Sequence, residues 1–212
     1  MSPRRTQAKS LKRATAKRPE RRTIAVFTEG KNSEPDYVNG LKRLPHIARD
    51  VALNLELHPQ HGVPLTLVRL AVERGKDPEI DECWCIFDVE WPRNHPHLET
   101  AVSLARKHGI GLAISNPCFE IWLVLHHKDF DKFCTTADIE RASRALDKRA
   151  GKSIDASQYL PLRTQAVRRA VVLEKRHRRD GTRFPHDNPS SGMNAFLHAV
   201  EGDQPAAGPD CP

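Results

Sequence analysis

Three acidic residues stand at the ends of two apolar runs that a folded chain would bury as strands. Glu29 follows the first run, and Asp88 and Glu90 follow the run at residues 83–87. Residues i and i+2 of an extended chain point to the same side, so Asp88 and Glu90 can share one ligand while Val89 packs away. Carboxylate oxygens of this kind suit Mg²⁺ or Mn²⁺. Such an ion activates water and stabilises charge on a phosphate, which predicts phosphoryl-transfer chemistry.

The plainer interpretation of each acid is a solvated group at the end of a strand, and for Glu29 alone that interpretation is favoured. The combination of Glu29 with Asp88 and Glu90 favours a metal site instead. Two small polar residues, Ser115 and Asn116, follow a further apolar run. Ligand sites of open parallel sheets lie outside the carboxyl ends of the strands. We therefore expect all five residues at one edge of a sheet.

The elements that would position these residues alternate along the chain. Short apolar runs predict strands, and apolar residues three and four apart predict helices. The expected strands are residues 23–27, 51–57, 83–87 and 110–114. The expected helices are one capped by Ser33 and ending near Pro45, residues 64–74, 98–108 and 118–127, one opening at Thr136, one running to about residue 179, and a last one starting at residues 188–191. This alternation predicts an α/β fold with a mainly parallel sheet flanked by helices.

The formal net charge of +7 is unevenly distributed over the 212 residues. Residues 1–22 hold nine Lys and Arg against one Glu and have no hydrophobic periodicity, which predicts a disordered basic arm. Residues 23–140 hold 12 basic and 18 acidic residues, whereas residues 141–183 hold 13 basic and four acidic ones. The expected segments are the arm at 1–22, an α/β core at 23–130, a helical basic lobe packed on the core at 131–201, and a frayed tail at 202–212.

The basic lobe suits the phosphate backbone of nucleic acid. The expected phosphate contacts on its long helix are Arg168, Arg169, Lys175 and Arg176. Lys31, Asn116 and Ser190 are further candidates, the latter two because helix N-termini favour anions. Their alternatives are a solvated lysine and two helix caps, and a basic helix face can also be solubilising charge. Stacking on bases is not favoured, since only Tyr159 and Phe184 lie in or beside the block.

The composition excludes a membrane-spanning protein, because no apolar run approaches the roughly 20 residues that a spanning helix needs. The N-terminus lacks the apolar stretch of a secretory signal. The five cysteines are odd in number and lack framework spacing, so we expect reduced thiols in a cytoplasmic protein. Cys83 and Cys85 alternate on one face of an expected strand, where core packing is favoured over metal binding.

Four motifs that follow one another between residues 22 and 200 resemble the signatures of the RloB-like family. They are TEGKNSEPDY at residues 28–37, FDVE at 87–90, SNPCFEIWL at 115–123 and NPSS at 188–191. That family is associated with abortive-infection and restriction loci of bacteria. The resemblance implies a Toprim-like fold, which topoisomerases, primases and several nucleases share.

The resemblance also implies roles for individual residues. The Toprim pattern places a Glu after the first strand and an Asp-x-Asp after a later one. Glu29 matches the first element, where it would be a general acid or base or a metal ligand. Asp88 and Glu90 match the second as metal ligands, although Glu90 replaces an Asp and sets its oxygens one methylene further out. Glu120 belongs to a family motif and is expected one turn into a helix, where it either completes the catalytic site or serves as a structural carboxylate.

The expected function is therefore a Mg²⁺-dependent nuclease that hydrolyses DNA or RNA in bacterial anti-phage defence. Mg²⁺ or Mn²⁺ is the expected cofactor, and nucleic acid and other proteins of a defence system are the expected partners, with no membrane partner. Self-association is left open. The alternative is a non-catalytic nucleic-acid-binding subunit of a defence complex. Nucleotidyl transfer would use the same metal chemistry, but the sequence has no P-loop.

Overall fold

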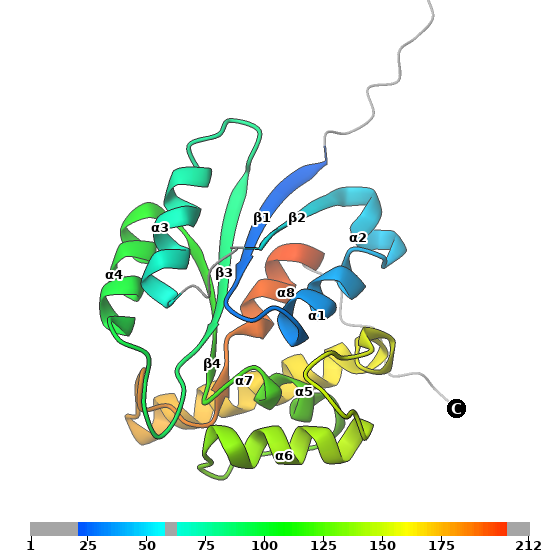
Figure 1. The fold of residues 1–212 in the computed structure, drawn as a ribbon, viewed down its shortest axis with the longest axis vertical. Helices are drawn as coiled ribbons and strands as arrows, with labels where there is room; N and C mark the ends of the chain where they lie inside the picture. Colours follow the sequence, from blue (N-terminus) through cyan, green and yellow to red (C-terminus); the bar gives the residue numbers. More distant parts are fainter. Residues whose placement is uncertain (1–20, 58–62, 203–212) are drawn as a thin grey trace, which may run out of the picture.

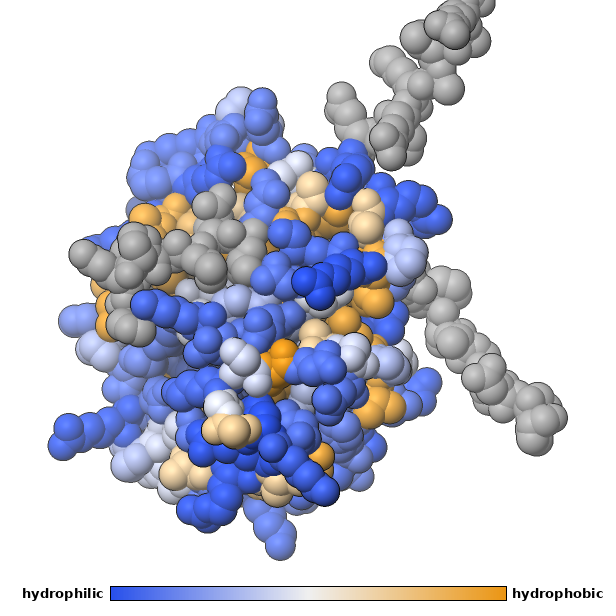
Figure 2. All heavy atoms as spheres, turned by 45° about the vertical axis from the view of Figure 1, so that its right-hand side comes forward, coloured by the Kyte–Doolittle hydropathy of each residue, from blue (hydrophilic) through white to orange (hydrophobic). Residues whose placement is uncertain are grey.

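The computed structural model describes residues 21–57 and 63–202 of the chain. The expected basic arm as far as residue 20, and the expected tail from residue 203, lie outside the described residues. Within the described ranges, no helix is both long and apolar enough to cross a membrane. Figure 2 shows a face on which hydrophilic residues predominate and hydrophobic ones form small, separate patches.

A five-stranded sheet with the order β2-β1-β3-β4-β5 forms the centre of the fold (Figure 1). Strands β1 to β4 are parallel, and β5 pairs antiparallel with β4 at the edge. The bounds are β1 (Arg22–Thr28), β2 (Val51–Leu57), β3 (Glu82–Asp88), β4 (Gly111–Asn116) and β5 (Ser190–Ser191). The expected α/β fold with a mainly parallel sheet is confirmed. All four expected strands form, with ends that differ from the prediction by at most two residues.

Helices cover both faces of this sheet, α3 and α4 on one face and α1, α5 and α8 on the other (Figure 1). Helices α6 and α7 pack against α5. The helices described are α1 (Ser33–Leu41), α2 (Pro45–Asp50), α3 (Pro64–Arg74), α4 (Leu98–His108), α5 (Glu120–His127), α6 (Thr136–Asp147), α7 (Arg163–Asp180) and α8 (Met193–Glu201). Two short 3₁₀ helices, Ala156–Gln158 and Leu160–Leu162, precede α7.

The centre of the first strand, residues 24–27, is apolar because both of its faces are buried. Ile24 and Val26 contact the core on the α1, α5 and α8 side, whereas Ala25 and Phe27 contact the core under α3 and α4. A strand covered by helices on both faces has no polar side to show to water. The continuous apolar run of the sequence is therefore the signature of a central strand.

The cysteines that the structure describes are buried and form no disulfide with one another. Cys83 and Cys85 pack in the core under α3 and α4, as the alternation of residues in the sequence predicts. Burial raises the pKa of the Cys85 thiol above its ordinary value, so the group is a neutral packing residue. The prediction of core packing at these two positions is confirmed.

The C-terminal region differs from the prediction in one respect. The sequence predicts that residues 188–191 begin the last helix, and this is wrong, because Ser190 and Ser191 form β5 and α8 begins at Met193. Ser191 pairs with Ser115, and Ser190 pairs with Asn116. The edge of β4 offers backbone N–H and C=O groups that would otherwise lack partners, and this pairing satisfies them.

Two further predictions fail near helix starts. Helix α2 is not predicted, because it is a single short segment that starts at Pro45. Ser33 is not the N-cap of α1 but its first residue, and Asn32 occupies the cap position. The Ser33 hydroxyl donates to the Lys152 carbonyl oxygen instead, at 2.8 Å. A contact across more than one hundred residues of sequence thus takes the place of a local cap.

Candidate active site

A cavity of about 280 Å³ opens at the carboxyl ends of β1 and β3. Six carboxylates from separate parts of the chain line it, and they are Glu29, Glu34, Asp88, Glu90, Glu120 and Glu140. Lys31 and Lys152 also line the cavity and are exposed. The structure therefore brings together the four acids that the sequence singles out as catalytic and adds two more.

The strand register places the first three acids. Thr28 pairs with Ile86, and the backbone N–H of Glu29 donates to the Ile86 carbonyl oxygen at 3.0 Å. Asp88 pairs with Ser115 at the end of β3. Because neighbouring parallel strands end at the same level, the residues that follow β1 and β3 meet at one edge of the sheet.

Glu29 is held by two contacts. Its Oε2 accepts a hydrogen bond from the backbone N–H of Asp88 at 3.1 Å, and its Oε1 lies 2.6 Å from Nε2 of His95. The contact with Glu29 raises the pKa of the His95 imidazole above its ordinary value, although partial burial opposes this. Glu29 is therefore an oriented carboxylate beside the His95 imidazole, and not a freely solvated group at the end of a strand.

Asp88 is the last residue of β3, and its Oδ1 is buried without a hydrogen-bond partner. Burial raises the pKa of Asp88 well above its ordinary value, and the nearby carboxylates of Glu34 and Glu29 raise it further. A buried carboxylate oxygen without a partner is costly unless a proton or a cation compensates for it. Asp88 is thus the carboxylate that a bound cation would stabilise most.

Glu90 lies where the chain turns away from the sheet. Its φ of 68° is in the left-handed region, which is uncommon for a residue other than glycine. Its backbone N–H donates to the Pro117 carbonyl oxygen at 2.8 Å, and its Oε2 accepts from the Thr136 hydroxyl at 2.8 Å. Val89 is buried in the core under α3 and α4. Asp88 and Glu90 therefore line the cavity while Val89 packs away, although Glu90 reaches the cavity from a left-handed turn and not from an extended strand.

Glu34 lies in the first turn of α1 and is buried. Burial raises the pKa of Glu34 to about 7, and the carboxylates of Glu120 and Glu29 act in the same direction. Its Oε1 accepts a hydrogen bond from the backbone N–H of Gly30 at 3.1 Å, and a Cβ at Gly30 would lie 2.3 Å from its Oε2. The missing side chain at Gly30 thus allows the carboxylate to approach the backbone. A carboxyl group with this pKa can exchange a proton near neutral pH.

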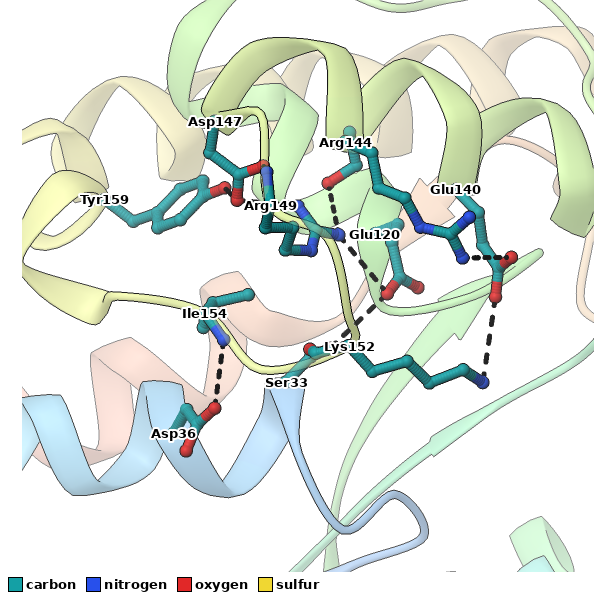
Figure 3. Close-up of polar contacts among 11 residues, drawn as sticks. Ser33, Asp36, Glu120, Glu140, Arg144, Asp147, Arg149, Lys152, Ile154 and Tyr159 are labelled. Atoms are coloured by element: carbon teal, nitrogen blue, oxygen red, sulfur yellow. Dashed lines mark hydrogen bonds and ion pairs between the residues drawn. The ribbon is translucent and has the colours of Figure 1, made fainter.

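Glu120 is the first residue of α5, and its carboxylate meets a network that reaches away from the cavity (Figure 3). Its Oε1 lies 3.4 Å from the Ser33 hydroxyl oxygen and 3.7 Å from Nη2 of Arg149. The buried Arg149 guanidinium also contacts Oδ2 of Asp147 at 2.7 Å, and Asp147 accepts from the Tyr159 hydroxyl at 2.6 Å. Glu120 therefore joins the cavity to a buried ion pair behind it.

The donor set suits a hard cation held partly by its substrate. Among the described residues, no group of three or more His, Cys, Asp and Glu side chains is arranged to hold a metal ion by itself. Mg²⁺ in phosphoryl-transfer sites is commonly bound by one or two carboxylates, with waters and substrate phosphates as its other ligands. The unpartnered Oδ1 of Asp88, among several oxygen donors, fits that manner of binding.

The residues expected to contact phosphate are dispersed. Lys31 lines the carboxylate cavity, but Asn116 and Ser190 do not. Asn116 ends β4 and is no helix cap, since its Nδ2 donates to the Pro185 carbonyl oxygen at 3.0 Å and to Oδ1 of Asp187 at 2.9 Å. Ser190, in β5, lines a separate cavity of about 740 Å³. The Asn116 amide thus holds the segment that leads to β5.

The four cations of α7 that are expected to contact phosphate fall into two groups. Arg169 contacts Asp129 at 2.9 Å and donates to the carbonyl oxygens of Leu125 and His126, so it binds the end of α5. Arg176 contacts Asp131 at 3.3 Å. Arg168 and Lys175 are exposed. Only the second pair is presented to solvent in the way that binding to a phosphate backbone requires.

Several cavity residues have no clear signal in the sequence. Glu140, Thr136 and Lys152 lie in or after α6, far along the chain from the strands. His95 approaches Glu29 because its backbone N–H donates to the Val89 carbonyl oxygen at 3.0 Å, which folds the loop after β3 back. Only Glu34 has a usable signal, since it follows Glu29 in the same conspicuously polar loop.

Comparison with known proteins adds a family match. A family model described as "RloB-like protein" matches residues 24–200. The match extends from β1 to α8 and includes every residue that lines the carboxylate cavity. The curated proteins and the solved structures give no match.

Proposed function

The chain belongs to the RloB-like family, and we propose that its carboxylate cavity is the active site of a Mg²⁺-dependent nuclease. The proposed reaction is hydrolysis of a phosphodiester bond in DNA or RNA, and the proposed setting is bacterial anti-phage defence. The observation that carries the proposal is the convergence of six carboxylates on one cavity, with Oδ1 of Asp88 buried and unpartnered among them. Such a cluster repels itself, so it serves a bound cation better than it serves the stability of the fold.

The placement of the acids agrees with the roles that the Toprim resemblance implies. Asp88 and Glu90, at the end of β3, are the proposed metal ligands, together with Glu29 after β1. Mg²⁺ held there would stabilise negative charge on the phosphate and lower the pKa of a water. The His95 imidazole beside Glu29 fixes the direction of that carboxylate.

Glu34 is the group that the cavity offers for proton transfer. Burial raises its pKa to about 7, so at neutral pH it is present in both protonation states. A general acid or base is most effective when its pKa lies near the working pH. Lys31, exposed at the mouth of the cavity, supplies a positive charge for a phosphate.

The test compares Asp88→Ala with the wild-type protein on labelled single- and double-stranded DNA and RNA. Reactions contain Mg²⁺, Mn²⁺ or EDTA. We expect cleavage that needs metal and that falls by about 10²–10³-fold or more in the variant, the range seen when a group that stabilises transition-state charge is removed. Glu73→Ala, an exposed acid of α3, is the matched control and should cleave like the wild type.

Two outcomes would contradict the proposal. Binding without cleavage under every condition, unchanged in Asp88→Ala, would favour the non-catalytic nucleic-acid-binding subunit. Cleavage that persists in both Asp88→Ala and Glu29→Ala would place the active site elsewhere in the protein. Mn²⁺ binding followed by electron paramagnetic resonance gives a readout that does not depend on finding the right substrate.

A further inference from the structure

Two aromatic side chains form an exposed pair on the surface. Trp91 is 38% exposed and Phe133 is 61% exposed. Their ring centroids lie 5.3 Å apart with an interplanar angle of 86°, an edge-to-face contact. Few large hydrophobic side chains of the described residues are this exposed, and these two lie against each other although they are far apart in the sequence. Exposed aromatic pairs of this kind mark binding surfaces more often than they mark core packing.

The pair is anchored directly to the carboxylate cavity. The backbone N–H of Trp91 donates to the Thr136 hydroxyl at 3.1 Å, and the Thr136 backbone N–H donates to the Trp91 carbonyl oxygen at 3.3 Å. The same Thr136 hydroxyl donates to Oε2 of Glu90 at 2.8 Å. Because Glu90 and Thr136 line the cavity, the aromatic pair lies at its rim.

A cation lies close to each aromatic residue in the sequence. Arg93 lies two residues after Trp91, and Lys132 directly precedes Phe133. Both cations are exposed, and neither forms an ion pair with another described residue. An exposed aromatic pair with a cation near each member in the sequence, beside a cavity suited to a phosphate, matches a nucleotide, which has a flat base and a charged backbone.

We propose that Trp91 and Phe133 form a stacking platform for an unpaired base next to the phosphodiester in the cavity, which makes single-stranded nucleic acid the substrate class. This inference rests on the proposed function, whose site it extends. The bases of a duplex are already stacked on their neighbours, and a platform beside the cavity reaches one only after it has been unstacked. An unpaired strand offers its bases at no such cost, so the platform discriminates against duplex.

Intrinsic fluorescence tests the platform without cleavage. Of the three tryptophans, Trp122 is fully buried and Trp84 is partly buried against Phe196, so Trp91 is the one presented to solvent. A short single-stranded oligonucleotide is titrated into the protein in EDTA, with a duplex of the same sequence in parallel. We expect saturable quenching by the single strand and weaker quenching by the duplex. Trp91→Phe should lose the quenching and keep the affinity, since it retains an aromatic face.

Affinity measured by fluorescence anisotropy of a labelled strand completes the test. The double variant Trp91→Ala/Phe133→Ala should bind single strands about five- to a hundred-fold more weakly, as expected for the loss of base stacking. Val172→Ala, which removes an exposed hydrophobic side chain of α7, is the matched control and should bind like the wild type. Equal binding of single strand and duplex, or unchanged affinity in the double variant, would overturn the platform.

The two proposals fail in distinguishable ways. If metal-dependent cleavage is lost in Asp88→Ala but single strands and duplexes are cleaved alike by wild type and double variant, the nuclease stands and the platform falls. If single strands bind and quench Trp91 but are never cleaved, the platform stands and the nuclease falls. Absence of any quenching by oligonucleotides, with a stable complex formed through the same pair by a second copy of this chain or by another protein, would make it a protein interface instead.

Discussion

Two groups of buried carboxylates lie on opposite sides of Glu120, and they differ in what balances their charge. In the cavity, burial raises the pKa of Glu34 to about 7 and that of Asp88 well above its ordinary value, and nearby carboxylates raise both further. Behind Glu120, burial would also raise the pKa of Asp147. Hydrogen bonds from Tyr159 and from Arg149 outweigh it and lower the pKa.

The difference separates a carboxylate that serves the fold from one that does not. Asp147 has its cation and its hydrogen-bond donors within the chain, so it is ionised and stabilising. Asp88 has an oxygen without a partner and like charges around it. Perturbed pKa values and unbalanced charge that gather in one cavity are typical of functional sites. The comparison supports the proposal that chemistry takes place in the cavity and not in the better-ordered cluster behind it.

Breaking the balanced cluster should have the largest effect on stability. Arg149→Met removes the cation and leaves the buried Asp147 carboxylate without a counter-charge. We expect the free energy of unfolding to fall by about 3–5 kcal/mol, as for other buried pairs that lose one partner. Urea denaturation measures this. Arg141→Met, in an exposed pair with Asp138, is the control and should cost no more than about 0.5 kcal/mol. Equal losses in the two variants would show that the Arg149 cluster is not a balanced buried pair.

Neutralising an acid of the cavity should raise the free energy of unfolding, and by less than Arg149→Met lowers it. Glu34 has a pKa of about 7 when folded and an ordinary value of 4.5, so the folded state binds the extra proton between these pH values. Its contribution to stability is full below about pH 4.5 and is lost as the pH rises towards 7. Glu34→Gln has no such proton to lose. We therefore expect the free energy of unfolding of the variant, relative to that of the wild type, to increase by up to about 3 kcal/mol as the pH rises over this range.

Chemical denaturation of both proteins at a series of pH values measures this difference. Glu99→Gln, an acid in the first turn of α4 that is exposed, is the control, and its difference from the wild type should stay flat. A flat difference for Glu34→Gln as well would mean that the Glu34 carboxyl is ionised at ordinary pH in the folded protein.

The cations of α7 extend the comparison from acids to bases, with the smallest expected effect. Arg168 and Lys175 are exposed, whereas Arg169 and Arg176 are engaged with Asp129 and Asp131. If the exposed pair contacts phosphates, the double variant Arg168→Ala/Lys175→Ala should reduce the slope of log affinity against log salt by about one per lost contact. The matched control is Arg178→Ala, whose guanidinium is paired with Glu174. An unchanged slope would remove α7 from the nucleic-acid surface.

Much of the sheet could be predicted from the sequence because its strands are buried on both faces. A continuous apolar run such as residues 23–27 has few alternatives to a central strand, and the polar residue after it then lies at an edge. The positions of Glu29, Asp88 and Glu90 follow from that edge alone. The prediction that Glu120 belongs to the site required the family resemblance, because nothing in its local pattern indicates which way the first residue of α5 points.

The features that could not be predicted from the sequence depend on contacts between distant parts of the chain. Ser33 has the residue type and the position of a helix cap, and the nearby Lys152 carbonyl oxygen takes its hydroxyl instead. The serines at 190 and 191 resemble a helix start, and the free edge of β4 makes them a strand. The pairing of His95 with Glu29, and of Trp91 with Phe133, needs loops whose course no periodicity records. Local rules fail where a tertiary partner competes with the local one.

The position of α8 has a consequence for how the protein is made. Met193, Phe196 and Leu197 fill the same core as Ile24 and Val26 of the first strand, so the last helix covers a face of the sheet that the earliest residues begin. A chain still attached to the ribosome lacks this cover until α8 has emerged. Premature termination anywhere before α8 would leave an incomplete core, and the carboxylates at the strand ends would lose their support. We therefore expect that a nascent or truncated chain without α8 has no complete carboxylate cavity, and that the cavity assembles only once α8 has been made.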